Sequence, residues 1–134
     1  MFYAPDQSPW GEVQHSEELC LGVYLVSTAS HGGVMAHNSI AKGLFSAAAR
    51  KCAFQQKGYV CFEEDCAATV AIRELLDKKL MRIPQGYTPQ EYNKCIDNSI
   101  QRYYPEYWQS HKRAIAKAER AAAQTRLFGD RDTR

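Results

Sequence analysis

The chain has two short polar motifs that contain its best candidates for chemistry. The first is His31-Gly32-Gly33, which follows a run of hydroxyl residues at 27, 28 and 30. Two glycines let a backbone approach a ligand closely, and an imidazole can act as general base, general acid or metal ligand. A structural role also fits, in which the glycines form a turn and His31 hydrogen-bonds a nearby carbonyl or carboxylate. Both interpretations stay open, since geometry and not sequence identifies a catalytic histidine.

The second motif, Glu63-Glu64-Asp65-Cys66, places three carboxylates and a thiol where a predicted strand ends and a helix begins. Asp65 suits the N-cap of that helix, because its carboxylate can accept hydrogen bonds from unpaired backbone N–H groups. Two of the carboxylates together with His31 are suitable ligands for a divalent cation. However, the sequence has no second histidine at helical spacing and no H-E-x-x-H motif. We therefore predict neither a metal nor a cofactor.

Cys66 is the candidate nucleophile of an enzymatic interpretation, because a helix N-terminus would stabilise its thiolate. A small hydrolase or metal-dependent enzyme would use His31 with Glu64, Asp65 or Cys66. The sequence has no protease signature, phosphate loop, dinucleotide fingerprint, G-x-S-x-G elbow or zinc pattern. This absence favours a non-enzymatic binding role. The predicted binding residues are Trp10, His31, Gly32, Gly33, Glu63, Glu64 and Asp65.

A third interpretation concerns the C-terminal segment, since residues 101–134 carry a net charge of +4 while residues 1–100 carry −2. Aromatic residues stand at 103, 104, 107 and 108, and basic residues near aromatic ones can follow a nucleic-acid backbone and stack on its bases. A nucleic-acid-binding accessory factor is therefore an alternative function. A solvated helix of mixed charge explains the same residues. The predicted contacts are Lys112, Arg113, Lys117, Arg120 and Arg126.

The elements that must position these residues follow from hydrophobic patterning. Residues 12–19, 22–29, 34–36 and 59–62 have strand character. Residues 30–33, with their two glycines, separate the second of these segments from the third as a hairpin or bulge. Residues 38–48 have helical spacing that Gly43 is expected to break. Residues 70–81 form an amphipathic helix whose polar face carries Arg73, Glu74, Asp77 and Lys78.

Two further helices are predicted towards the C-terminus. Thr88 and Glu91 form a capping box with Pro89 at the first helical position, so a helix should run from Pro89 to about Tyr103. This helix should bury Tyr92, Cys95, Ile96 and Ile100. Residues 106–126 have high helix propensity but little to bury, so this helix should project or fray. The expected fold is α+β: a small antiparallel sheet of three to four short strands packed against helices, with a long C-terminal helical segment. We divide the chain into an α+β domain (1–104), a basic helix (105–128) and a disordered tail (129–134).

The composition of the chain indicates in which cellular compartment the protein is expected. At 45% hydrophobic and 24% charged, the 134-residue chain is typical of one globular domain, and it has no apolar run of the roughly 20 residues that a membrane span needs. Its five cysteines include no C-x-x-C pair, so we read them as free thiols in a reducing compartment. The N-terminus lacks the pattern of a secretory signal. We therefore expect a cytoplasmic protein without a membrane partner.

The motifs Ser8-Pro9-Trp10-Gly11, Ser27 to Gly33 and Phe62 to Cys66, in this order, resemble a family of domains of unknown function encoded on plasmids, integrative conjugative elements and phages. The resemblance covers about residues 8–75, and residues 84–134 look peculiar to this branch. It implies a mobile-element setting and no established activity. Small proteins of such elements often resemble anti-defence inhibitors of the anti-CRISPR type. The leading hypothesis is therefore a binding protein that contacts a host protein or nucleoprotein complex, such as a CRISPR effector.

Overall fold

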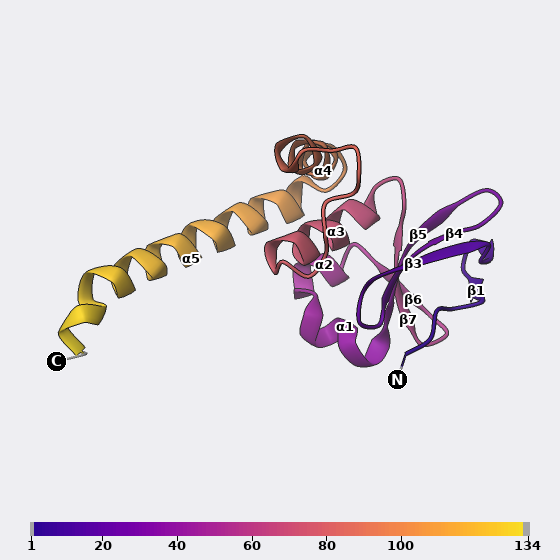
Figure 1. The fold of residues 1–134 in the computed structure, drawn as a ribbon, viewed down its shortest axis with the longest axis horizontal. Coiled ribbons are helices and arrows are strands. Elements are labelled where there is room, and N and C mark those ends of the chain that lie inside the picture. The colour runs from indigo at the N-terminus through magenta and orange to yellow at the C-terminus, as the bar shows by residue number, and fades with distance from the viewer. Residues whose placement is uncertain (1, 133–134) are drawn as a thin grey trace.

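The computed structural model describes residues 2–132 and places a sheet beside a layer of helices, from which one long helix extends (Figure 1). The α+β class, the antiparallel sheet and the long C-terminal helix are confirmed. The strands are β1 (Gln7–Ser8), β2 (Gly11–Glu12), β3 (His15–Cys20), β4 (Val23–Ser27), β5 (Gly32–His37), β6 (Phe54–Gln56) and β7 (Tyr59–Glu63). The helices are α1 (Asn38–Leu44), α2 (Ala47–Arg50), α3 (Ala67–Asp77), α4 (Pro89–Tyr103) and α5 (Pro105–Asp132).

The main sheet has five antiparallel strands in the order β3-β4-β5-β7-β6, and β1 pairs separately with β2. It has one strand more than the upper expectation, because the edge strand β6 was not predicted. Its three residues are exposed and largely polar, so they show no alternation of apolar and polar residues. Residues 32 and 33 begin β5 and pair with Ser27 and Val26 of β4, so the hairpin of the two predicted alternatives is confirmed and the bulge is not formed.

Alternating side chains divide the core between the two faces of the sheet. Val23, Val34 and Phe62 face the helices, where Leu75 of α3 and Ile100 of α4 join them in the main core. The opposite face has a smaller core formed by Tyr24, Val26, Met35 and Cys61, and Trp10 and Val13 of the N-terminal segment pack against it. The N-terminal β1-β2 hairpin therefore acts as the second covering layer.

Local capping signals explain why some helix boundaries match the predictions and others do not. Helix α4 begins at Pro89 as expected, and the Thr88 hydroxyl accepts a hydrogen bond from the Glu91 N–H at 3.1 Å. The N-cap of α3 is Cys66, with no side-chain capping bond, so the prediction that Asp65 caps this helix was wrong. Helix α3 ends at Asp77, before the predicted Met81, because Lys79 adopts a left-handed backbone (φ 57°).

The first helical stretch also differs in detail from the prediction. Gly43 lies within α1, and the break falls at Phe45 and Ser46, whose backbones are extended. The Ser46 hydroxyl accepts a hydrogen bond from the Ala49 N–H, which starts α2. Of the residues that α4 was predicted to bury, Ile96 and Ile100 are buried and Tyr92 is half-buried, whereas Cys95 is exposed.

Helix α5 has a packed beginning and a projecting remainder (Figure 1). Tyr107 is 5% exposed and belongs to the main core, with Tyr104 and Trp108 packed around it. The body of the molecule therefore includes the first turns of α5 and does not end at residue 104. The helix continues to Asp132, through residues 129–132 of the segment expected to be disordered, and residues 133 and 134 lie outside the described part. Among residues 2–132, no helix combines the length and apolarity required to cross a membrane.

Candidate functional site

The three motifs of the sequence resemblance come together on one part of the sheet. Gly33 of β5 pairs with Glu63 of β7, and the Glu64 N–H donates a hydrogen bond to the Gly32 carbonyl at 3.1 Å. Trp10 lies against Gly33 from the second face of the sheet. The order of the motifs along the chain gave no indication that they are neighbours. The strand order β5-β7 is what places the glycine pair beside the carboxylates.

Both glycines are required by close contacts. A Cβ atom on Gly33 would lie 2.2 Å from the Phe62 carbonyl oxygen and 2.5 Å from the Trp10 ring. A Cβ atom on Gly32 would lie 2.4 Å from the Val26 carbonyl oxygen. The space above Gly33 is thus filled by Trp10, and this accounts for the residues at 32 and 33 without a ligand.

His31 lies in a tight turn at the edge of this region and is exposed. The Thr28 hydroxyl donates to the His31 carbonyl at 2.8 Å and accepts from the His31 N–H at 3.1 Å. The His31 Nδ1 atom lies 2.6 Å from the Ser30 carbonyl oxygen. A carbonyl oxygen only accepts hydrogen bonds, so Nδ1 carries the proton and Nε2 is the atom left to bind something else.

The backbone of His31 lies near that of the three carboxylate residues, but the His31 side chain makes no polar contact of its own with their carboxylates. Glu63, Glu64 and Asp65 are all exposed, and within residues 2–132 no hydrogen bond or ion pair links any of them to His31. Cys66 is half-buried, and its Sγ accepts a hydrogen bond at 3.5 Å from the Tyr104 hydroxyl in the helical layer. Across the same residues, no three His, Cys, Asp or Glu side chains cluster closely enough to hold a metal ion.

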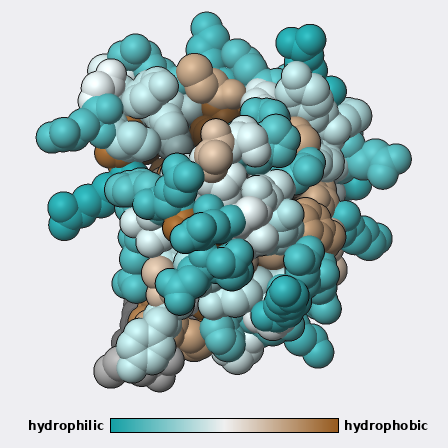
Figure 2. Space-filling view, turned by 90° about the vertical axis from the view of Figure 1, so that its right-hand side faces the viewer, coloured by the Kyte–Doolittle hydropathy of each residue, from teal (hydrophilic) through white to brown (hydrophobic). Residues whose placement is uncertain are grey.

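Figure 2 shows the molecule from the side of the strands and the N-terminal hairpin. Hydrophilic side chains cover most of this side, with apolar groups between them. The carboxylates of residues 63–65 are exposed, so they can contact a binding partner at the surface, and they do not form an enclosed site.

A polar network that sequence patterning placed on a solvent-facing surface lies inside the helical layer. Arg73 is only 8% exposed. Its guanidinium pairs with Asp77 in the same helix and with Asp97 of α4, both at 3.0 Å. The Nε2 atom of His111 lies 2.7 Å from Asp77 Oδ2, so the network reaches α5. Burial alone would raise the pKa of Asp77, but His111 and Arg73 outweigh it and lower that pKa.

Glu74 makes a second connection between helices. Its Oε1 accepts from the Ser46 N–H at 2.7 Å, and its Oε2 accepts from the Ser46 hydroxyl at 2.8 Å and the Tyr107 hydroxyl at 2.7 Å. Burial and the adjacent Glu74 carboxylate raise the pKa of Tyr107. Arg73 and Glu74 thus fix where α5 leaves the body. Their role was missed because amphipathic spacing identifies a polar face but not the helices that cover it.

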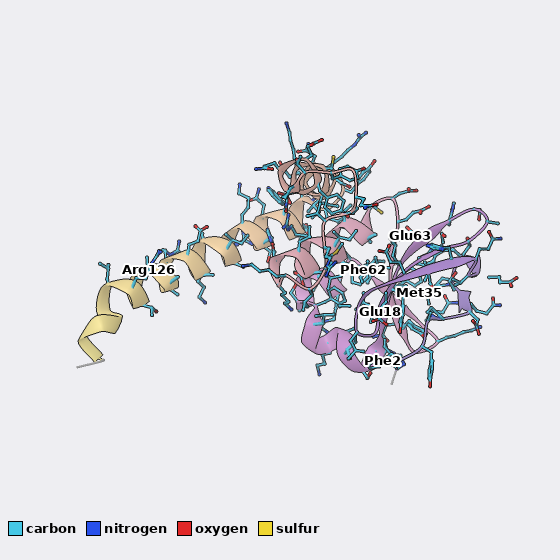
Figure 3. All side chains as sticks on the ribbon, in the orientation of Figure 1. Phe2, Glu18, Met35, Phe62, Glu63 and Arg126 are labelled. Carbon is cyan, nitrogen blue, oxygen red and sulfur yellow. The ribbon has the colours of Figure 1, made fainter. Side chains whose placement is uncertain are left out.

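The basic residues predicted on α5 are all exposed, and they occupy two sides of the helix. Arg113, Lys117 and Arg120 follow one another at spacings of four and three residues, which places them on one face. Lys112 lies on the other side, where it lines a groove with Trp108 and Asp97. Figure 3 shows Arg126 far along the projecting helix, at the opposite end of the molecule from Glu63. The two sets of predicted contacts are therefore well separated.

The aromatic residues around the α4–α5 junction serve mainly to pack it. Tyr107 is buried, and Tyr104 and Trp108 are half-buried, whereas Tyr103 is 52% exposed. Arg102 lies over the Tyr103 ring, 5.4 Å from its centroid. Of the four aromatics proposed to stack on bases, only Tyr103 is largely free to do so.

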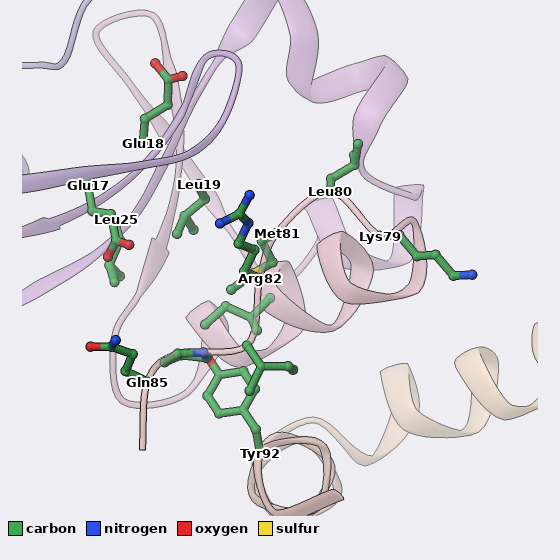
Figure 4. Close-up of a pocket in the computed structure, with 13 residues that line it drawn as sticks. Glu17, Glu18, Leu19, Leu25, Lys79, Leu80, Met81, Arg82, Gln85 and Tyr92 are labelled. Atoms are coloured by element: carbon green, nitrogen blue, oxygen red, sulfur yellow. The ribbon is translucent and has the colours of Figure 1, made fainter. Parts of the chain in front are cut away.

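A cavity of about 540 Å³ lies between β3 and the segment that follows α3. Figure 4 shows Leu19 and Leu25 on its sheet side and Tyr92 reaching into it from α4, while Glu18 and Lys79 point away. None of the residues singled out from the sequence as binding or catalytic lines it.

Comparison with known proteins identifies the family to which the chain belongs. No curated protein and no solved structure is significantly similar to the chain. The family model described as Domain of unknown function (DUF7007) matches residues 3–133. This range is wider than the expected 8–75, so the view that residues 84–134 are peculiar to one branch was wrong, and α4 and α5 are part of the family domain. The chain belongs to the DUF7007 family.

Proposed function

We propose that this protein acts by binding another macromolecule and that the projecting part of α5 is its main contact element. The observation that carries the proposal is the exposure of this helix. From Glu119 to Leu127 every described side chain is exposed except Ala123, which is half-buried. In water a helical segment of this length is marginal without tertiary contacts, even when it is rich in alanine. A partner that covers it would supply the missing contacts.

The way α5 is anchored supports the same proposal. Tyr107, held by Glu74, and His111, held by Asp77, connect its first turns to the body. A helix that only closed the core would need to extend little beyond these residues, yet α5 continues for a further 21 residues after His111, to Asp132. The body therefore presents the helix at a defined position, as a binding element requires.

The sequence resemblance supplies the proposed setting. In a cytoplasmic protein of a plasmid, integrative element or phage, such a helix would serve an anti-defence inhibitor that occupies the surface of a host protein or nucleoprotein complex. With a net charge of +2, the chain does not match the strongly acidic surface of a DNA mimic. An anti-CRISPR-type role would therefore depend on shape and on local charge along α5.

Affinity capture from a lysate of the host cells tests the proposed function with three purified proteins. The full chain is compared with a chain that ends at Ala118, which keeps Tyr107, His111 and Ile115 in place. The third protein is Glu63→Gln/Glu64→Gln/Asp65→Asn in the full chain. We expect the shortened chain to lose a partner that both full-length proteins retain, with unchanged near-UV circular dichroism of the body. Equal capture by the shortened chain would refute the assignment to α5.

A further inference from the structure

The outer face of α5 carries three exposed cations, Arg113, Lys117 and Arg120, which we call the basic stripe. We infer that the basic stripe binds the phosphate backbone of a nucleic acid and does not contact its bases. This inference rests on the proposed role of α5 in binding. The macromolecule that contacts α5 would then be a nucleic acid.

The spacing of the basic stripe suits a row of phosphates. With a rise of about 1.5 Å per residue, the three side chains start about 6 Å and 4.5 Å apart along the helix, and they lie within about 60° of one another around it. Long flexible side chains at this spacing can each reach a separate phosphate, since one strand of a duplex carries a charge every 3.4 Å along its axis. None of the three forms an ion pair with another described residue.

The acidic residues of α5 leave this stretch of the face clear. Glu119 lines the groove beside Trp108 and therefore lies on the side towards the body. Glu106 shares the outer face but lies about 10 Å before Arg113 along the helix. The net charge of −2 on residues 1–100 would repel a polyanion, and α5 projects away from the part of the molecule that carries this charge (Figure 1).

The composition of the face favours phosphate over other anionic partners. From Gln109 to Gln124 this face has no large apolar side chain, and Leu127, which is 71% exposed, follows on the same face one turn beyond Gln124. Stable protein interfaces usually centre on buried aromatic or apolar anchors, and membrane-surface helices need an apolar face to insert. A stripe of cations and amides lacks both. Because Tyr104, Tyr107 and Trp108 are packed, binding should not depend on base stacking or sequence.

Fluorescence anisotropy with a labelled 20-base-pair duplex of mixed sequence tests the inference, with the full chain in 50 to 200 mM KCl. Three phosphate contacts predict a slope of about −2.7 for log K against log salt, which is a loss of about 40-fold in affinity over this range. The variant Arg113→Gln/Lys117→Gln/Arg120→Gln should lose the binding and the slope. The matched control Lys42→Gln/Lys51→Gln/Lys94→Gln removes the same charge from exposed positions on the body and should retain both.

The outcomes separate this inference from the proposed function. Absence of duplex binding at 50 mM KCl, or equal losses in the two triple variants, would overturn the nucleic-acid assignment. The assignment would also be overturned if the captured partner is an acidic protein whose binding depends on the basic stripe while duplex binding does not. If α5-dependent capture persists while duplex binding is absent, only the inference fails. If removal of residues 119–134 leaves both the capture and the duplex binding unchanged, the proposed role of the projecting part of α5 fails.

Discussion

Replacing Arg73 by methionine removes the cation at the centre of the network that joins α3, α4 and α5. The methionine retains most of the buried aliphatic volume, so the change isolates the ion pairs from packing. Asp77 and Asp97 then lose their shared partner at 3.0 Å, and two carboxylates face each other across the α3–α4 contact. We expect a clear loss of stability in a protein that still folds.

The magnitude follows from the burial of the partners. Breaking a fully buried ion pair by removing one partner costs about 3–5 kcal/mol, because an uncompensated charge stays in the interior. Here the side chains of Asp77 and Asp97 are 35% and 29% exposed, so water compensates part of this cost. We therefore expect Arg73→Met to lower the free energy of unfolding by about 2 kcal/mol.

Urea denaturation followed by circular dichroism at 222 nm measures this loss. With a slope of about 2 kcal/mol per M, typical of a small domain, the midpoint should fall by about 1 M. Arg102→Met is the matched control, since Arg102 is exposed near the end of α4, and its effect should stay within about 0.5 kcal/mol. Adding Asp97→Asn to Arg73→Met should cost less than the two single changes together. A loss below about 0.5 kcal/mol for Arg73→Met would refute the role given to this network.

Three further predictions concern the sheet and the titrating groups. Gly33→Ala should destabilise the fold by about 2 kcal/mol or more, because its Cβ would meet Trp10 and a carbonyl, whereas Gly43→Ala, with nothing within 4 Å, should stabilise α1 by about 0.5 kcal/mol in the same urea assay. The pKa of Asp77 is lower in the folded protein than in the unfolded chain. This difference stabilises the fold at pH values above the unfolded pKa, and the stabilisation is lost as the pH falls through the folded pKa. Asp77→Asn should therefore flatten the dependence of the unfolding free energy on pH below about 4, and an unchanged profile would contradict this. The raised pKa of Tyr107 stabilises the fold below the usual tyrosine pKa, and this stabilisation is lost at higher pH. The phenolate absorbance of Tyr107 at 295 nm should therefore appear only with unfolding, above about pH 10, and Tyr107→Phe should lack that part of the signal. A phenolate signal that precedes unfolding would contradict the burial of Tyr107.

Local sequence signals predicted the elements whose boundaries depend on adjacent residues. Helix α4 begins at Pro89 because the Thr88 cap, the proline and Glu91 are all within four residues. The strands β4 and β7 were recognisable from their apolar, β-branched and aromatic residues. The edge strand β6 carries no such pattern, because it is exposed and polar.

The candidate site could be predicted only in part, since its geometry depends on contacts between distant residues. The motifs around Gly33 and Glu63 were visible in the sequence, but their adjacency follows from the pairing of β5 with β7. Asp97 and His111 meet the α3 network from 24 and 34 residues away in sequence. Helical periodicity placed the α3 residues on a polar face, and it contains no information about which helix covers that face.

Hydrogen–deuterium exchange along α5 measures whether its projecting part lacks a tertiary partner in the free protein and gains one on binding. In the free protein, amides at 119–127 should exchange much faster than those of α3, which is largely buried. After addition of the duplex, amides at 113–120, the segment of the basic stripe, should become protected. After addition of the partner recovered by capture, amides at 119–127 should become protected. Amides of β5 and β7 should stay unchanged in both cases. Protection of 119–127 equal to that of α3 in the free protein, or no change after addition of either partner, would contradict the account.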